Sequence, residues 1–554
     1  MRARTKLGGA LAVAAAAALL ALALGGAPAG AASSRPNILV ILTDDQTADE
    51  LSPTAMPITY GSVKGGGTEF SRFYASYPIC CPARATLLSG QYMHDHRIRG
   101  NVPPLGGHEE VRLRGSEATW LPTWLNAAGY DTAHVGKYLN GYGDDNNALV
   151  PPGWDEWYGQ LSAFDRDEVG GKLYYNYQLL EKGMLGPATT KTYGATTADY
   201  QTDVLQEKAL DVLDDFNATT NPFYLEFAVS APHFPFTPAS KYIGSMAAAT
   251  LPPLSARNEK DISDKPAFLR QDASGRLKAA TLATLDGQRR MRLEMLRSVD
   301  DAVGALLGKL ATQGRLANTY VIFTSDNGYF FGEHRIIAGK YLPYEPSSRV
   351  PFVIRGPGIP PGLSTPELSA NIDVAPTIAA IAGATPTIPV DGRSLLPFAT
   401  DIAARSDRPL LFEADIGPGL GTRGIGLKPR RRAVARLGLF GARGVTNLEQ
   451  ESGARRMAAN GDHAPAYRSI RTNRYLMTIY SSGEIELYDM INDPAQLTSL
   501  GKSKRYAKVR KVLLRRLLSL SGCQAATCNV SYGKDPKPLP KRKKIGKKPV
   551  AKKE

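Results

Sequence analysis

Four short apolar runs divide the chain, and each of them ends in charged or polar residues. They are PNILVILTDDQ (36–46), YDTAHVGK (130–137), NPFYLEFAVSAPH (221–233) and NTYVIFTSDN (318–327). A short run dominated by branched and aromatic residues is typical of a strand buried on both faces of a parallel sheet. The pattern therefore predicts four buried strands whose carboxyl ends carry polar side chains.

Helical periodicity lies between these runs. In residues 197–216 and 287–313, apolar positions recur with the spacing of one helix face. Strands that alternate with helices predict an α/β fold with a mostly parallel sheet flanked by helices. In such sheets ligands collect outside the carboxyl ends of the strands, so we expect the polar residues at those ends to form a site.

The character of the chain changes from about residue 405. SIRTNRYLMTIYSSGEIELYDM (469–490) predicts two strands joined by a Ser-Ser-Gly turn, and an amphipathic helix follows at 502–520. We expect a smaller C-terminal α+β subdomain made of an antiparallel sheet and a helix. Residues 417–465 are rich in Gly and Arg and are predicted to form a long irregular loop.

The first residues have the pattern of a secretory signal: a basic start, an apolar run and the small residues Ala29-Gly30-Ala31. We expect cleavage near residue 31 or 32 and a protein that is secreted or associated with the cell envelope. An uncleaved membrane anchor is the alternative, because the apolar run is almost long enough to span a bilayer. The predicted organisation is a signal peptide (1–32), a large α/β domain (33–404), the C-terminal subdomain (405–520) and a basic tail (521–554).

Charge is concentrated at the C-terminus. The chain of 554 residues has a formal net charge of +15, and from residue 501 onward it has 18 Lys or Arg against two acidic residues. The last stretch, KPLPKRKKIGKKPVAKKE, cannot bury a core and is expected to be disordered. It either attracts anionic envelope polymers or nucleic acid in a salt-sensitive way, or only aids solubility. No specific nucleic acid is predicted.

The chain has four cysteines. Cys523 and Cys528 are expected to form a local disulfide in an exported protein, because a metal site there would need further Cys or His residues nearby. Cys80 and Cys81 are left without distant partners. They stand just ahead of a predicted helix and are followed by Pro82 and Arg84. A buried core thiol or a disulfide between neighbours is the ordinary interpretation of such a pair.

Two of the predicted strands end in oxygen ligands. Asp44 and Asp45 follow the first strand, and Asp326 and Asn327 follow the last. Taken alone, either pair is common in helix caps and turns. Three carboxylates that converge without a cation would repel one another, and carboxylate and amide oxygens suit calcium or magnesium better than zinc. The two pairs together predict a metal site.

Basic residues are expected around this metal. If the strands are adjacent, Arg84, Lys137, His233 and Lys340 face the same region. A divalent cation surrounded by Arg and Lys makes a site for an anion such as sulfate or phosphate. Each residue alone has an ordinary interpretation, a surface lysine or a histidine in a turn.

The stretch Cys80-Cys81-Pro82-Ala83-Arg84 resembles the C-x-P-x-R pattern of the sulfatase family. Other segments resemble that family in the same order, namely PNILVILTDDQ, GKYLNGYG, APHFPF, TSDNGYFFGEH and RTNRYLMTIYSSGEIELYDMINDP. The resemblance covers roughly residues 35–520. The branch it resembles most contains N-acetylglucosamine-6-sulfatases and related bacterial arylsulfatase-like enzymes.

This resemblance implies a sulfuric ester hydrolase whose residues 33–404 form the catalytic domain. Cys80 would be converted by the formylglycine-generating enzyme to Cα-formylglycine (3-oxoalanine), whose hydrated aldehyde is the nucleophile. One calcium would be bound by Asp44, Asp45, Asp326, Asn327 and the modified Cys80. Arg84 would stabilise the hydrated aldehyde, and Lys137 and Lys340 would neutralise charge on the sulfate. His233 would protonate the leaving alcohol or orient the sulfate, a task that Lys340 would share.

Two positions depart from the family pattern. Ala83 stands where many members have Ser, and Leu139 stands where many have His; the GKYLN branch shares the second feature. The expected substrate is a sulfated small molecule or glycan, such as an aryl sulfate or a 6-sulfated hexosamine. The alternatives are a phosphatase or phosphonate monoester hydrolase of the same superfamily, and an unconverted protein that only binds sulfated glycans.

Overall fold

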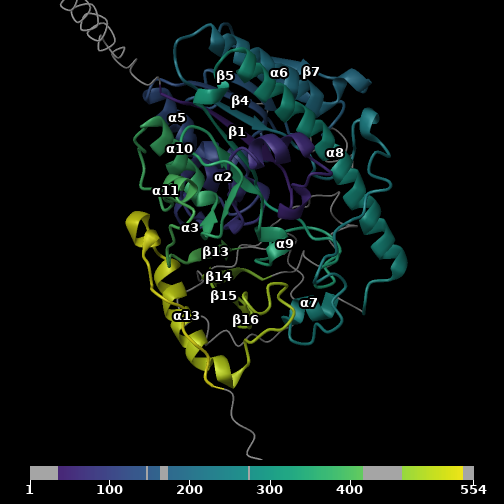
Figure 1. Ribbon diagram of the computed structural model, residues 1–554, viewed down its shortest axis with the longest axis vertical. Helices are drawn as coiled ribbons and strands as arrows, with labels where there is room; N and C mark the ends of the chain where they lie inside the picture. Colours follow the sequence, from purple (N-terminus) through teal and green to yellow (C-terminus); the bar gives the residue numbers. More distant parts are fainter. Residues whose placement is uncertain (1–34, 145–147, 163–172, 273–274, 416–464, 541–554) are drawn as a thin grey trace, which may run out of the picture.

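The computed structural model describes residues 35–144, 148–162, 173–272, 275–415 and 465–540 (Figure 1). The expected signal peptide, nearly all of the loop predicted at 417–465 and the last fourteen residues of the tail lie outside the described residues. The main element is one ten-stranded sheet with the strand order β11-β2-β10-β9-β1-β8-β4-β5-β6-β7.

The middle of this sheet is parallel. β1 (Asn37–Thr43) lies between β8 (Phe223–Ala228) and β9 (Thr319–Ser325), and β4 (Asp131–Lys137) and β5 (Glu156–Gln160) continue the parallel set beyond β8. The four strands predicted from the apolar runs are therefore confirmed. Because neighbouring parallel strands end at the same edge, the residues that follow them meet there.

The two margins of the sheet contain antiparallel pairs. β10 runs against β9 and β2, and the hairpin-connected strands β6 and β7 continue antiparallel from β5. A small parallel pair of strands, β3 and β12, stands apart from the main sheet. The bounds of these strands are β2 Thr68–Phe70, β3 Phe73–Tyr74, β6 Gln178–Lys182, β7 Thr189–Thr192, β10 Phe352–Arg355, β11 Leu363–Thr365 and β12 Ser369–Ala370.

Helices cover both faces of the sheet, as predicted. In β1, Leu39 and Ile41 face the layer of α6 (Gln201–Asn217) and α8 (Ala279–Thr312), whereas Ile38 and Val40 belong to the core on the opposite face. The helices of that second layer are α2 (Cys80–Ser89), α5 (Leu121–Ala127) and α10 (Val374–Ala382). The remaining helices of the large domain are α3 (Met93–His96), α4 (Gly107–Leu113), α7 (Ala267–Asp272), α9 (Glu345–Ser348) and α11 (Leu396–Thr400). None of the helices in the described part combines the length and apolar character that a membrane span needs.

The C-terminal subdomain is a four-stranded antiparallel sheet packed on a helix, as predicted. The strands follow one another in chain order, and the apolar face of the helix packs on their sheet. The elements are β13 Leu410–Ala414, β14 Tyr467–Arg471, β15 Tyr475–Tyr480, β16 Ile485–Asp489 and α13 Ala507–Leu520.

The structure extends this subdomain beyond the boundary expected at residue 520. Cys523 and Cys528 form the predicted disulfide, and the short 3-10 helix Ala525–Asn529 begins inside the loop that the disulfide closes. The Asp535 carboxylate accepts hydrogen bonds from Thr472 Oγ1 at 2.8 Å and from the Arg474 amide at 2.9 Å. Asp535 is thus tied to the sheet, so the described residues 521–540, which were expected to belong to a disordered tail, pack against the subdomain.

Candidate active site

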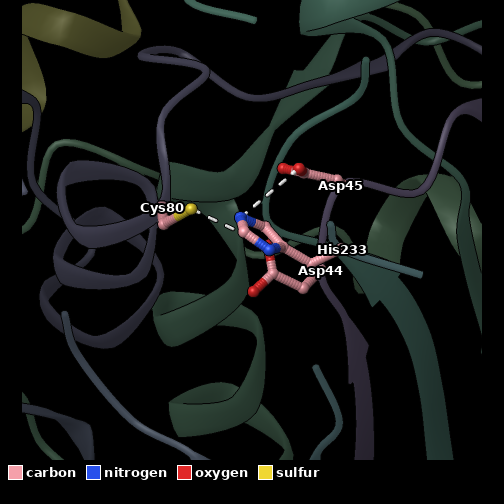
Figure 2. Close-up of side chains that lie close together, drawn as sticks. All are labelled: Asp44, Asp45, Cys80 and His233. Carbon is pink, nitrogen blue, oxygen red and sulfur yellow. Dashed lines mark hydrogen bonds and ion pairs between the residues drawn. The ribbon is translucent and has the colours of Figure 1, made fainter. Parts of the chain in front are cut away.

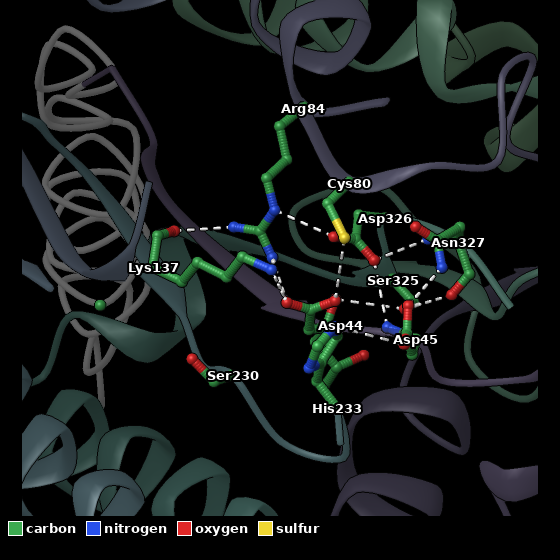
Figure 3. Close-up of polar contacts among 12 residues, drawn as sticks. Asp44, Asp45, Cys80, Arg84, Lys137, Ser230, His233, Ser325, Asp326 and Asn327 are labelled. Carbon is green, nitrogen blue, oxygen red and sulfur yellow. Dashed lines mark hydrogen bonds and ion pairs between the residues drawn. The ribbon is translucent and has the colours of Figure 1, made fainter. Parts of the chain in front are cut away.

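The ends of β1 and β9 are joined by hydrogen bonds between their oxygen-bearing residues (Figure 3). Asp326 Oδ1 accepts from the Asp45 amide at 3.1 Å and from the Asn327 amide at 2.7 Å, and Asn327 Nδ2 donates to Asp45 Oδ1 at 2.5 Å. Asp45 has a left-handed backbone with φ of 68°, which turns the chain sharply after Asp44. The two pairs predicted to bind a metal therefore form one cluster.

Helix α2 begins at this cluster with Cys80. The thiol Sγ lies 3.7 Å from Asp44 Oδ1 and 2.8 Å from Lys340 Nζ. The start of the helix is held by Asn371, whose Oδ1 accepts from the Ser76 amide and hydroxyl at 3.1 and 3.0 Å, and whose Nδ2 donates to the Ala83 carbonyl at 3.2 Å. Cys80 and Cys81 are both free, so the alternative of a disulfide between neighbours does not describe this structure.

The expected basic residues surround the same cluster. Arg84 Nε donates to Asp326 Oδ2 at 2.9 Å and its NH1 donates to the Lys137 carbonyl at 2.7 Å. The Lys137 amine contacts Asp44, and the Lys340 amine contacts Asp45. The structure thus brings Arg84, Lys137 and Lys340 to the carboxylates that the sequence analysis placed at the strand ends.

His233 approaches from the end of β8. Its Nε2 lies 3.7 Å from Asp45 Oδ2, and donor atoms of Asp44, Asp45, Cys80 and His233 all lie within 4.8 Å of one another (Figure 2). The imidazole is the most accessible side chain of the group, with 20% exposure against 14% for each lysine and at most 3% for Arg84 and the two aspartates. The site therefore opens to solvent on its histidine and lysine side.

The carboxylates are buried among fixed positive charges. Burial alone raises the pKa of Asp44, but Lys137, His233, Arg84 and Lys340 together hold that pKa well below its usual range. Burial and the nearby Asp44 charge raise the pKa of Asp326. Burial opposes the charge of Lys340, yet Asp45 raises the pKa of this amine well above its usual value. Asp44 therefore stays ionised, and the Lys340 amine stays protonated, near neutral pH.

The surroundings of the Cys80 thiol disfavour its thiolate form. Burial, followed by the Asp44 charge, raises its pKa to about 12. Because only the thiolate is a strong nucleophile, Cys80 remains a neutral thiol at physiological pH. A reaction at this position needs chemistry other than that of a thiolate.

The donor set fits a hard divalent cation. Asp44, Asp45 and Asp326 offer carboxylate oxygens, and Asn327 Oδ1 is a buried amide oxygen for which the described chain provides no hydrogen-bond partner. An orphaned oxygen beside three carboxylates is what a calcium or magnesium ion would satisfy. The residues present therefore fit the metal expected from the sequence.

One supporting residue was missed by the sequence analysis. Arg292 of α8 is fully buried, pairs with Glu50 at 2.7 Å, and donates to the carbonyl oxygens of Asp45 at 2.6 Å and Pro232 at 2.9 Å. Its guanidinium also lies 5.1 Å from the ring centroid of Tyr329. The only available signal was an arginine on the apolar face of a predicted helix.

A family model described as Sulfatase matches residues 36–384. The chain belongs to the sulfatase family. It is 31% identical to human N-acetylglucosamine-6-sulfatase over 538 residues, which cover 94% of this chain and 91% of that protein. It is also 31% identical to the arylsulfatase of Volvox carteri, over 92% of this chain and 78% of that protein. The prediction of a sulfuric ester hydrolase is therefore confirmed at the level of the family.

Other similarities are shorter or more distant. The chain spans about half (49%) of a Caenorhabditis elegans extracellular sulfatase Sulf-1 homolog, with 35% identity over 366 residues. Among solved structures, a protein in complex with its substrate D-glucosamine-2-N,6-O-disulfate superposes with a TM-score of 0.64 and 22% identity, covering 87% of this chain and 97% of that one. The phosphonate monoester hydrolase of Agrobacterium radiobacter superposes with a TM-score of 0.60 and 22% identity, covering 88% of this chain and 95% of that one. At these identities the structural likeness concerns the fold alone, and it confirms the predicted fold class.

Proposed function

We propose that this sulfatase is an exported enzyme that hydrolyses O-sulfate esters of sulfated sugars, with Cys80 converted to formylglycine and one calcium at the carboxylate cluster. The observation that carries the proposal is the position of Cys80. It lies at the buried start of α2, 3.7 Å from Asp44 and 2.8 Å from the Lys340 amine. At this position, residue 80 contacts both a candidate metal ligand, Asp44, and a candidate sulfate-binding cation, Lys340.

The modification of Cys80 explains why a cysteine stands in this position. With a pKa of about 12, the thiol itself has little thiolate at neutral pH. As formylglycine, the residue would supply a hydrated aldehyde oxygen for attack on sulfur. Cys80, Pro82 and Arg84 match the C-x-P-x-R pattern that directs this conversion in the family. The formylglycine-generating enzyme is accordingly the maturation partner that we infer.

The metal would be held by Asp44, Asp45, Asp326 and Asn327, together with the converted Cys80. Three of these side chains are carboxylates, and the Asn327 oxygen is otherwise unpartnered within the described chain. A bound calcium would supply the positive charge that draws a sulfate oxygen and an ionised nucleophile into one place.

The basic side chains have distinct positions around the reacting group. Arg84, locked by Asp326 and the Lys137 carbonyl, would stabilise the hydrated form of residue 80. The Lys137 and Lys340 amines would neutralise the charge that develops on sulfate oxygens as the ester bond breaks. His233, the most accessible of the group, would protonate the leaving alcohol or orient the sulfate, a task that Lys340 would share.

We infer a sulfated sugar, with a 6-sulfated hexosamine as the first candidate. Full-length similarity to human N-acetylglucosamine-6-sulfatase supports this choice, as does the fold shared with a protein whose substrate is D-glucosamine-2-N,6-O-disulfate. Export rests on the signal pattern of residues 1–32 and on relatives named extracellular sulfatases.

The test combines mass spectrometry with substrate comparison. Protein is produced with the converting enzyme, and the tryptic peptide FYASYPICCPAR (73–84) is trapped with a hydrazine. We expect an aldehyde at residue 80, and turnover of aryl sulfate well above that of aryl phosphate and phosphonate monoester. Cys80→Ala should lose turnover, whereas the matched Cys81→Ala control should keep it. Two intact thiols, or a preference for phosphate or phosphonate, would overturn the proposal in favour of the glycan-binding or phosphatase alternatives.

A further inference from the structure

Helix α13 and the short turn before it carry a row of basic side chains, which we call the basic stripe: Lys504, Lys508, Lys511 and Arg515. All four are exposed. Lys504 stands in the short helical turn Lys504–Tyr506 that leads into α13, and spacings of four, three and four residues place the side chains on one face of a helix. The opposite face is the buried one, formed by Val509, Leu513, Leu517 and Leu520.

No acidic residue close in sequence neutralises the basic stripe. Between residues 494 and 534 the sequence contains no Asp or Glu. The next acid, Asp535, is engaged with Thr472, the Arg474 amide and Arg516, whose NH1 lies 3.3 Å away. Within the described residues no ion pair involves a side chain of the stripe. Like charges three and four residues apart on a helix repel one another, and an anionic partner would relieve this repulsion.

The end of the described chain returns to the same place. Residues 535–539 run back along α13: Asp535 contacts Arg516, and the Leu539 carbonyl and amide bond to Arg505 at 2.6 and 3.0 Å. The chain therefore passes residue 540 close to Lys504, at the start of the stripe. The sequence that follows, residues 541–554, contains eight Lys or Arg and one Glu. In the sequence, the basic stripe is therefore followed by further positive charge.

We propose that the basic stripe is a secondary binding site for a linear sulfated polysaccharide, the polymer that carries the sulfate esters of the proposed function, on which this inference rests. Four cations follow one another along on the order of 16 Å of helix, which suits a linear polyanion with closely spaced charges. The stripe offers no exposed aromatic side chain for base stacking, since Tyr506 is buried. This composition favours a glycan over single-stranded nucleic acid. Binding there would raise the concentration of sulfate esters around the enzyme.

The experiment measures retention on immobilised heparin in a NaCl gradient. Lys504→Gln, Lys508→Gln, Lys511→Gln and Arg515→Gln are combined in the full chain, and also in a chain ending at residue 540 so that the tail does not hide the loss. A matched control removes the same charge from exposed positions elsewhere, namely Lys191, Lys260, Arg276 and Lys278. We expect the stripe variant to bind heparin at least about tenfold more weakly than the parent at 0.15 M salt. The slope of its log affinity against log salt concentration should be smaller in magnitude by about three. The affinity of the control should stay within about twofold of that of the parent. Turnover of a small aryl sulfate should be unchanged in both.

Two results would overturn the proposal. One is a stripe variant that elutes with the control in both chain lengths. The other is a parent protein that binds a DNA duplex or phosphatidylserine vesicles as tightly as heparin, which would assign the stripe to nucleic acid or membrane. Heparin binding needs no turnover and is also measured on Cys80→Ala, so a failure of the sulfatase proposal leaves this readout intact.

Discussion

The guanidinium of Arg292 donates a 2.6 Å hydrogen bond to the backbone carbonyl of Asp45, although 247 residues separate the two in the chain. The same side chain donates to the Pro232 carbonyl at 2.9 Å and pairs with the buried carboxylate of Glu50. One arginine on α8 therefore holds the turn after β1, which carries Asp45, and the turn after β8, which carries His233.

Arg292→Met should unfold more easily and turn over more slowly. Removing one partner of a buried ion pair costs about 3–5 kcal/mol, because the buried Glu50 side chain would lose its cationic partner. In the double variant Arg292→Met/Glu50→Gln we expect part of the free energy of unfolding to return, while turnover stays low because the Asp45 and Pro232 carbonyls remain unheld. Urea denaturation and steady-state kinetics measure the two effects separately. Recovery of turnover together with stability would show that Arg292 supports only the fold.

Asp326→Asn should reduce turnover by about 10²–10³-fold or more. The change preserves shape but removes a carboxylate from the proposed calcium site and the partner of Arg84. Calcium binding, followed by isothermal titration calorimetry, should weaken in parallel. Asp131→Asn is the matched control, because Asp131 lies at the amino end of β4, where its carboxylate accepts hydrogen bonds from Thr219 Oγ1 and Asn221 Nδ2. Normal turnover of Asp326→Asn would contradict the site assignment.

Chelation should abolish activity, and calcium should restore it. A ligand that binds only the folded state stabilises it by about 2.7 kcal/mol at one hundred times its Kd, so the melting temperature should rise with calcium and fall with EGTA. Magnesium at equal concentration should restore less, because it demands tighter octahedral geometry than this mixed carboxylate and amide set offers. Full activity after exhaustive chelation would exclude the proposed metal.

His94 should make stability depend on pH. Burial opposes its charge, but the hydrogen bond and charge of Glu413 raise its pKa to about 9, and its Nε2 also contacts the Cys523 carbonyl at 2.8 Å. A histidine with a raised pKa contributes stability that is complete below its unfolded pKa of about 6.5 and is lost as pH rises through about 9. The contribution is about 3 kcal/mol.

The control for this pH effect is His94→Gln. Burial raises the pKa of Asp391 to about 7 and that of Asp95 above its usual value, and Arg468 lies 3.3 Å from Glu413, so the slope of the parent alone does not isolate His94. We expect the difference in free energy of unfolding between parent and variant to shrink from pH 6.5 to pH 9.5 in urea denaturation. A constant difference across that range would mean that His94 does not change protonation with folding.

Much of the site was readable from the sequence because its residues are local to strand ends. The apolar run before Asp44 and Asp45, and the one before Asp326 and Asn327, each predict a buried strand, and polar residues after such strands meet at one edge. The C-x-P-x-R stretch at Cys80 and the close spacing of Cys523 and Cys528 are also local patterns. In each case, the information lies within about ten residues of chain.

Tertiary structure alone decided the contacts that join distant segments. The strand order β9-β1-β8-β4 determines which strand ends adjoin Asp45, and the bond from Arg292 to the Asp45 carbonyl depends on how α8 packs across that sheet. Residues 535–539 run back along α13 because Arg505 and Arg516 contact them. From its composition alone, this segment is predicted to be part of a tail. Such contacts are invisible in the sequence because they depend on packing between faces of separate elements, whereas strand and helix periodicity reports only which face of one element is buried.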